Sequence, residues 1–202
     1  GKKHGIPTGI DMAADVPPVS NLWRFNDMGF DFVVISGGKA MRGPQSAGLL
    51  MGRKNIIEAA RLHMPPRGGT IGRGMKINKE EIFGMYVALE KYIHHDHDKE
   101  WKGWETNISI IEDAVKKVPG VTTEVHVPPL GNHTPTLRIT WDTTKVKVSD
   151  KELREAMGFG NPSIVLGGGT DNSVNVTVFM LKPGQEKIVA TRLKEELNKA
   201  TA

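Results

Sequence analysis

A six-residue apolar segment, Asp31 to Ser36 (Asp-Phe-Val-Val-Ile-Ser), limits the possible folds more than any other feature of this chain. Its continuous apolar character is typical of a strand that is buried on both faces of a sheet. Apolar segments at residues 6–10 and 47–52 predict two further strands, and helices are expected at residues 21–28 and 55–63. The first part of the chain is therefore expected to have an α/β architecture.

The remaining sequence predicts a different domain. Asn78 and Glu81 have the spacing of a capping box, which predicts the start of a helix at this point. Further helices are expected at residues 105–118, 150–157 and 183–199, and strands at 121–127, 136–141, 163–166 and 173–181. We therefore expect three regions: part of a large domain at 1–78, a connecting helix at 79–103, and a small α+β domain at 104–202.

Composition excludes several classes of site. The chain has 202 residues, a net charge of +4 and no cysteine, which excludes disulfides, thiolate metal sites and a cysteine nucleophile. Lys and Arg are scattered among acidic residues, so nucleic-acid binding is not expected. Residues 94–97 (His-His-Asp-His) are adjacent on a helix and point in different directions, so no metal site is expected there. The lack of a long apolar segment and of a signal peptide favours a cytoplasmic protein.

Two residues stand where a ligand site is expected. Asp11 ends the first predicted strand and Lys39 follows the second, so both should face the crevice beyond the carboxyl ends of the strands. A lysine amine at such a place can form an imine with an aldehyde, and an aspartate can hold a proton on a pyridine nitrogen. Ser36, Gly37 and Gly38 offer a hydroxyl and allow the backbone to approach a phosphate. An ordinary loop lysine and a strand-capping aspartate would nevertheless show the same spacing.

Longer segments around these residues resemble a known family. They are Ile10–Asp15, Ser36–Gln45 (Ser-Gly-Gly-Lys-Ala-Met-Arg-Gly-Pro-Gln) and Ile71–Lys76, with fainter similarity at residues 161–164 and 181–184. They are similar to fold-type-I pyridoxal-phosphate (PLP) enzymes of the group that contains bacterial selenocysteine synthase and D-glucosaminate-6-phosphate ammonia-lyase. The resemblance implies the C-terminal part of an aspartate-aminotransferase-type large domain, followed by a small α+β domain.

The resemblance also implies roles in cofactor binding. Lys39 would hold PLP as a Schiff base and transfer protons, and Asp11 would pair with the pyridine nitrogen. Ala13 would lie near the cofactor ring, while Ser36 and Gly38 would lie at its phosphate. The run Gly43, Pro44 and Gln45 would reach the phosphate in a neighbouring subunit, which implies a homodimer or a larger homo-oligomer. An ordinary turn is the alternative for that run.

Three cations are candidates for substrate binding. Arg73 and Lys76 precede the helix expected at Asn78, whose N-terminus favours an anion. In selenocysteine synthase both matching positions are arginine and bind the phosphate-like part of the selenium donor. Lysine lacks the bidentate fork of arginine, so a generic phosphate site, or a solvated basic turn, is expected here. Arg138 is a candidate for a substrate carboxylate, with a structural arginine as the alternative.

These expectations favour a PLP-dependent lyase that eliminates ammonia from an amino acid or a phosphorylated amino sugar acid. Selenium transfer to seryl-tRNA is the alternative enzyme, and a structural or assembly module is the alternative outside catalysis. The resemblance implies a substantial segment before the lysine strand, which supplies part of the active site in complete enzymes of this fold. We therefore expect a missing N-terminal half, or a second chain, to complete the active site.

Overall fold

The computed structural model describes residues 1–201, which form two compact units. The first unit contains Gly1–Asp96 together with Pro129–His133, and the second contains His97–Pro128 and residues 134–201. The loop Pro129–His133 thus belongs to the first unit although it follows β4 (Val121–His126) of the second unit in the chain. No helix among residues 1–201 is long and apolar enough to cross a membrane.

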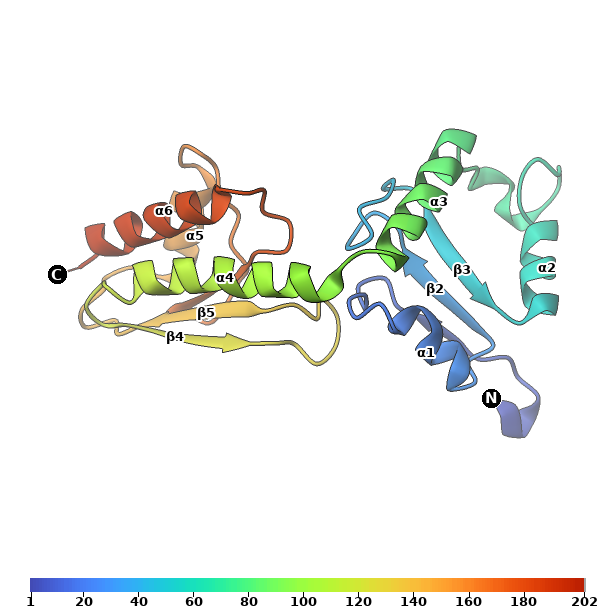
Figure 1. Ribbon diagram of the computed structural model, residues 1–202, viewed down its shortest axis with the longest axis horizontal. Coiled ribbons are helices and arrows are strands. Elements are labelled where there is room, and N and C mark those ends of the chain that lie inside the picture. The colour runs from blue at the N-terminus through green and yellow to red at the C-terminus, as the bar shows by residue number, and fades with distance from the viewer. Residues whose placement is uncertain (202) are drawn as a thin grey trace. The chain divides into compact units, whose positions relative to one another are not determined.

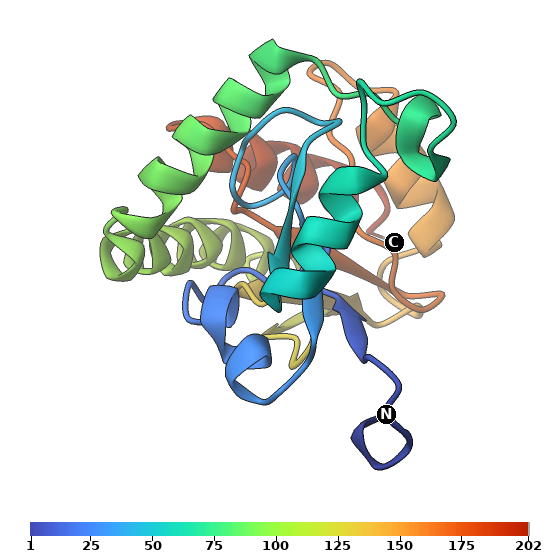
Figure 2. The same ribbon diagram turned by 90° about the vertical axis from the view of Figure 1, so that its right-hand side faces the viewer.

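A three-stranded sheet organises the first unit. Its strands are β1 (Gly9–Asp11), β2 (Phe32–Ser36) and β3 (Gly48–Gly52), in the order β1-β2-β3. β1 is parallel to β2, and β3 is antiparallel to it. Between β1 and β2 the chain forms α1 (Asn21–Asp27), and β3 leads into α2 (Lys54–Leu62), which lies against it (Figure 2). The α/β fold class predicted from sequence is confirmed.

The first unit ends with α3 (Lys79–Ile93). The Glu81 carboxylate accepts a hydrogen bond of 3.2 Å from the backbone N–H of Asn78, the helix-capping position that the sequence predicts. Along α3, Met85 and Tyr92 are buried in the core of the unit. They join a cluster made by the strands and their connections: Met12, Val16, Leu22, Val33, Ile35, Met41 and Ala47.

The second unit is a sheet with helices on one face (Figure 1). Its strands β4, β5 (Thr136–Trp141) and β6 (Ser173–Thr177) are antiparallel. Its helices are α4 (His97–Val115), α5 (Asp150–Gly158) and α6 (Gln185–Lys199). Leu137, Ile139 and Trp141 alternate along β5 and are buried beneath the helices, as a half-covered strand requires.

Several elements differ from the sequence-based expectation. Where one connecting helix is expected over residues 79–103, the structure has α3 and the start of α4. No strand forms at residues 163–166, where Ile164 N–H donates to the carbonyl of Met157 at the end of α5. β6 ends at Thr177, because the chain turns and Leu181 N–H bonds to the carbonyl of Val178 at 3.0 Å.

One carboxylate joins the ends of all three strands of the first unit. The backbone N–H of Thr8, just before β1, donates to Asp31 Oδ2 at 2.7 Å, and Arg53 Nη1 donates to Asp31 Oδ1 at 2.9 Å. Arg53 follows β3 and is the N-cap residue of α2. The hydrogen bond from Thr8 N–H, followed by the guanidinium of Arg53, lowers the pKa of Asp31 from 3.8 to about 2. Asp31 therefore fixes the sheet at the end away from the carboxyl ends of β1 and β2.

Candidate active site

The two principal candidates leave the sheet at the same edge. Asp11 is the last residue of β1 and lies opposite Val34 of β2 in the parallel pairing. β2 continues two residues further to Ser36, and Lys39 follows it in the loop. Parallel pairing places both side chains beyond the carboxyl ends of the strands, which is where ligands bind in open α/β sheets.

The Asp11 carboxylate is fixed by its own turn. Its Oδ1 atom accepts a hydrogen bond of 2.9 Å from the backbone N–H of Ala13. Between these residues, Met12 is fully buried, and its N–H donates to the carbonyl of Val34 at 2.8 Å. Among residues 1–201 no hydrogen bond or ion pair engages Asp11 Oδ2. This oxygen is available to hold a proton on a ligand nitrogen.

The loop that carries Lys39 is closed by backbone hydrogen bonds. Gly37 N–H donates to the carbonyl of Ala47 at 2.9 Å, and Gly43 N–H donates to the carbonyl of Gly37 at 2.8 Å. Arg42 has a left-handed backbone, with φ of 54°, and its N–H donates to the carbonyl of Lys39 at 2.8 Å. The Lys39 side chain is exposed and makes no ion pair in the described part of the chain. The loop thus presents an amine on a backbone that is held at several points.

The inner face of α3 packs closely against this loop. A Cβ atom at Gly43 would lie 3.1 Å from Met85 Sδ and from the Cβ of Ala88. A Cβ at Gly37 would overlap Met85 Sδ and lie 2.8 Å from the carbonyl oxygen of Ala47. Gly37 is therefore required for α3 to approach the loop so closely, whereas a Cβ at Gly43 would need its neighbours to move by a few tenths of an ångström. The sequence did not indicate this packing role.

The residues predicted at the cofactor phosphate have different surroundings. Ser36 is half-buried, and its hydroxyl has no hydrogen-bond partner within residues 1–201. Gln45 Nε2 donates to the carbonyl of Gly38 at 3.2 Å, which closes its own loop. The structure therefore leaves the Ser36 hydroxyl available and engages the Gln45 amide, whose predicted contact with a neighbouring subunit stays a prediction.

Arg73 and Lys76 lie in the segment between α2 and α3. Arg73 is in a short 3₁₀ turn, Ile71–Gly74, and this turn is tied to the end of α2 by a hydrogen bond of 2.9 Å from Gly72 N–H to the carbonyl of His63. The side chains of Arg73 and Lys76 are exposed and form no ion pair in the described part of the chain. Both cations are therefore free to bind an anion.

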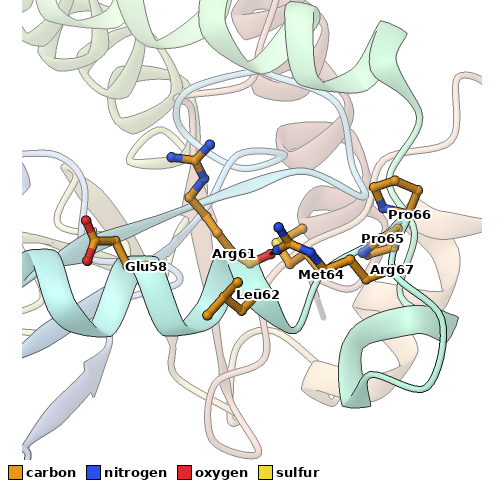
Figure 3. A pocket seen from close by; sticks show the side chains of 7 residues that line it. All are labelled: Glu58, Arg61, Leu62, Met64, Pro65, Pro66 and Arg67. Atoms are coloured by element: carbon orange, nitrogen blue, oxygen red, sulfur yellow. Dashed lines mark hydrogen bonds between the residues drawn. The ribbon is translucent and has the colours of Figure 1, made fainter.

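A cavity of about 750 Å³ opens at the end of α2 and contains two further cations, Arg61 and Arg67 (Figure 3). Its other lining residues are Glu58, Leu62, Met64, Pro65 and Pro66. Arg67 Nη1 donates to the carbonyl of Arg61 at 3.3 Å, so it also caps the C-terminus of α2. These arginines were not predicted as site residues, because their proximity depends on how residues 63–67 fold back against the helix.

Arg138 lies on the exposed face of β5, in the second unit. Its Nη1 donates to the Glu124 carboxylate of the adjacent strand β4 at 2.9 Å, directly across the antiparallel pair. A carboxylate partner at this distance neutralises the guanidinium, which favours the structural alternative over substrate binding.

Proteins similar in sequence cover the chain, although no protein-family model matches it. A 5'-C-glycyluridine monooxygenase-decarboxylase from Streptomyces sp is 27% identical over 98% of this chain and 48% of its own length. The L-seryl-tRNA(Sec) selenium transferase of Aquifex aeolicus is 26% identical over 82% of this chain and 40% of its own. The D-glucosaminate-6-phosphate ammonia lyase of Salmonella typhimurium is 24% identical over 94% of this chain and 48% of its own length. The chain is related to the selenocysteine synthase and ammonia-lyase group of fold-type-I PLP enzymes.

Solved structures agree with this relationship at the level of the fold. A D-glucosaminate-6-phosphate ammonia-lyase superposes with a TM-score of 0.77 at 21% identity, covering 98% of this chain and 51% of that chain. A structure of SPT with PLP superposes with a TM-score of 0.57 at 14% identity, covering 96% of this chain and 48% of that chain. The predicted fold-type-I architecture is confirmed, and the neighbour solved with PLP holds the cofactor that the sequence predicts for this chain. This chain spans about half the length of the relatives that it matches.

Proposed function

We propose that this chain is part of a PLP-dependent lyase that eliminates ammonia from an amino acid or a phosphorylated amino sugar acid. The observation that carries the proposal is the pair formed by Asp11 and Lys39, which leave parallel strands at the same edge of the sheet. An exposed amine, a carboxylate oxygen without a partner and the free hydroxyl of Ser36 match the ring aldehyde, the ring nitrogen and the phosphate of PLP.

Each of these residues has a role of its own in the proposed reaction. PLP, when bound, supplies an electron sink for a carbanion at the substrate α-carbon. Lys39 Nζ attaches the cofactor until the substrate amine displaces it, and then removes the α-proton and protonates the departing β-hydroxyl, which leaves as water. Lys39 takes the cofactor back and releases the product as an enamine, which tautomerises to an imine and is hydrolysed to a 2-oxo acid and ammonia. Asp11 holds a proton on the ring nitrogen, and Ser36 and Gly38 bind the phosphate.

The substrate is proposed to carry a phosphate. Arg73 and Lys76 are exposed cations without carboxylate partners, and they lie just before the N-terminus of α3. Two cations beside a helix N-terminus suit a doubly charged phosphate better than a single carboxylate. D-glucosaminate 6-phosphate, named for one relative, is therefore the first substrate to test.

The cofactor assignment can be tested without activity. The full chain is mixed with PLP, the near-UV and visible absorbance of the bound cofactor is recorded, and the complex is reduced with borohydride and mapped by peptide mass. We expect the adduct on Lys39, and we expect Lys39→Ala to lose both the absorbance and the adduct while remaining folded. Lys54→Ala, an exposed lysine on α2, is the matched control. An adduct on another lysine would contradict the assignment. A chain that binds no PLP, even when polypeptide matching the other half of its relatives is added, would favour an assembly module.

The reaction itself is tested by its products. Ammonia and carbon dioxide are measured in the same aerobic incubation of the PLP-loaded protein with D-glucosaminate 6-phosphate, and separately with 5'-C-glycyluridine, the compound named for another relative. Ammonia release supports the lyase. Release of carbon dioxide alone would favour a decarboxylase, a second candidate that rests on the relative matched over 98% of the chain. Selenium incorporation into seryl-tRNA without ammonia release would favour the transferase.

A further inference from the structure

The turn that follows β1 is held by a distant segment of the chain, the loop Pro129–His133, which belongs to the first unit. Gly131 N–H donates to Asp15 Oδ1 at 2.9 Å, and Asn132 N–H donates to the carbonyl of Ala14 at 2.7 Å. Asp15 and Gly131 are 116 positions apart in the sequence. These hydrogen bonds therefore join two segments that no local sequence pattern connects.

Two consecutive left-handed residues allow the loop to donate in this way. Gly131 has a φ of 60° and Asn132 a φ of 48°, a region that residues other than Gly, Asn and Asp rarely adopt. Their N–H groups reach the same turn, one at a carboxylate and one at a carbonyl. Asp15 is half-buried, so its hydrogen bond with Gly131 N–H is charge-assisted and partly shielded from competing water.

A second contact fixes the same turn from α1. Asn21, buried at the start of α1, donates from Nδ2 to the carbonyl of Asp15 at 2.6 Å. Inside the turn, Asp15 N–H donates to the carbonyl of Met12 at 3.2 Å, and Ala13 N–H donates to Asp11 Oδ1. Contacts from α1 and from the loop therefore both act on Asp15, at the end of the turn that orients the Asp11 carboxylate.

We propose that Asp15 is a positioning residue, which keeps the Asp11 carboxylate in the orientation needed to face a ligand nitrogen. The Asp15 carboxylate anchors the loop, and the loop in turn fixes Ala14, next to the Ala13 N–H that Asp11 accepts. Without the Asp15 carboxylate, Gly131 N–H would lose its acceptor and the turn would sample other conformations. The identity of the ligand as PLP rests on the proposed function, whereas the anchoring of Asp11 does not.

Amide hydrogen exchange of the full chain, resolved by NMR, tests the anchoring without cofactor or substrate. Asp15→Ala should speed exchange about tenfold at Gly131, at Asn132 and, through the turn, at Ala13. Asp15→Asn keeps a side-chain oxygen that can accept the Gly131 N–H, so it should restore most of the protection. Asp27→Ala removes the same charge from an exposed position of α1 and should change none of these rates.

Exchange at the amides of β2 separates positioning from general stability. These rates should stay unchanged in Asp15→Ala, because the hydrogen bonds of Asp15 lie in the turn and not in the sheet. Equal acceleration at β2 and in the turn would give Asp15 a general stabilising role and overturn the proposal. Faster exchange at Gly131 with an unchanged rate at Ala13 would overturn it as well, since the loop would then be anchored without acting on Asp11.

A double-mutant cycle with PLP tests whether Asp15 acts through Asp11. Asp15→Ala alone should raise the Kd for PLP about tenfold, measured from the absorbance of the bound cofactor. In the Asp11→Asn background the same change should have little further effect, because the group that Asp15 positions is already altered. Equal effects in both backgrounds would contradict the positioning role. Failure of the unmodified protein to bind PLP would contradict the proposed function alone, and the exchange rate at Ala13 would still decide the role of Asp15.

Discussion

At the scale of single residues, the candidate site depends on groups whose backbone is held in place but whose reactive atoms have no hydrogen-bond or ion-pair partner among the described residues. Asp11 keeps one carboxylate oxygen without a partner in the described residues, and Lys39 has no counter-ion there. Both positions could be predicted from sequence, because a residue that ends or follows an apolar strand must lie at the edge of the sheet. Arg61 and Arg67 could not, because their shared cavity depends on how the chain folds back after α2.

Asp11→Asn should retain some PLP and lose most of the activity. The amide cannot keep a proton on the ring nitrogen. Asp11 is exposed in this chain, so the effect is expected in the complete enzyme, where a site that excludes water makes the loss of such an interaction cost about 3 kcal/mol, or roughly a hundredfold in kcat. Asp27→Asn, on the surface at the end of α1, is the control. Unchanged turnover of Asp11→Asn would make Asp11 a structural residue.

Arg73→Ala should remove most of the preference for a phosphorylated substrate over its dephosphorylated analogue, and Lys76→Ala should weaken it less. The guanidinium can bind a phosphate through two hydrogen bonds, whereas the lysine ammonium acts as a point charge. The measurement is kcat/KM for both substrates with both variants. If the unphosphorylated amino acid reacts equally well with the unmodified protein, the phosphate site is wrong.

At the scale of elements, the sequence predicted the positions of helices and strands well wherever one local pattern was sufficient to identify the element. β2 and β3 lie at the predicted residues, because their apolar segments are continuous and bounded by Gly or Asp. The start of α4 was missed, since residues 97–103 are polar apart from Trp101, and Trp104 is the first of its buried series. The strand predicted at residues 163–166 is absent because this segment bonds to the end of α5.

Gly37→Ala should destabilise the first unit by about 1–3 kcal/mol, the range found when a packed core receives an extra methyl group. The added Cβ would press on the backbone carbonyl of Ala47 as well as on Met85, and the carbonyl cannot move without breaking the loop closure. Urea unfolding measures the change. Gly74→Ala, where no atom lies within 4 Å of the new Cβ, should have little effect.

Asp31 makes the stability of the first unit dependent on pH in the acid range. Its pKa is lowered from 3.8 to about 2 in the folded chain, so its stabilising contribution is complete well above pH 3.8 and is lost as pH falls through about 2. Asp31→Asn should therefore be less stable than the unmodified protein at neutral pH, and the difference should shrink through this window. Acid titrations of both proteins, followed by circular dichroism, would show it. A difference that stays constant from neutral pH to pH 2 would contradict this role.

At the scale of the whole molecule, the chain has two units, each with its own core and sheet. The related enzymes are about twice as long as this chain, so a complete active site in them has further polypeptide available. Sequence patterns could predict the α/β and α+β character of the two units, because each depends on short apolar repeats. They could not place the loop Pro129–His133 in the first unit, since its hydrogen bond to Asp15 joins residues that are 116 positions apart.

The close packing of α3 against Gly37 and Gly43 has a thermodynamic consequence. The loop that packs against α3 contains Lys39 and also the run Gly43–Gln45, which is predicted to reach a neighbouring subunit. A ligand that orders this loop should therefore also strengthen the association of the two subunits. Coupling between two binding equilibria is reciprocal. If PLP binding raises the affinity of the dimer by some factor, dimer formation raises the affinity for PLP by the same factor. We expect saturating PLP to lower the dimer Kd in sedimentation experiments, and Gly43→Ala to reduce that shift. Identical dimer Kd values with and without PLP would mean that the two sites are energetically independent.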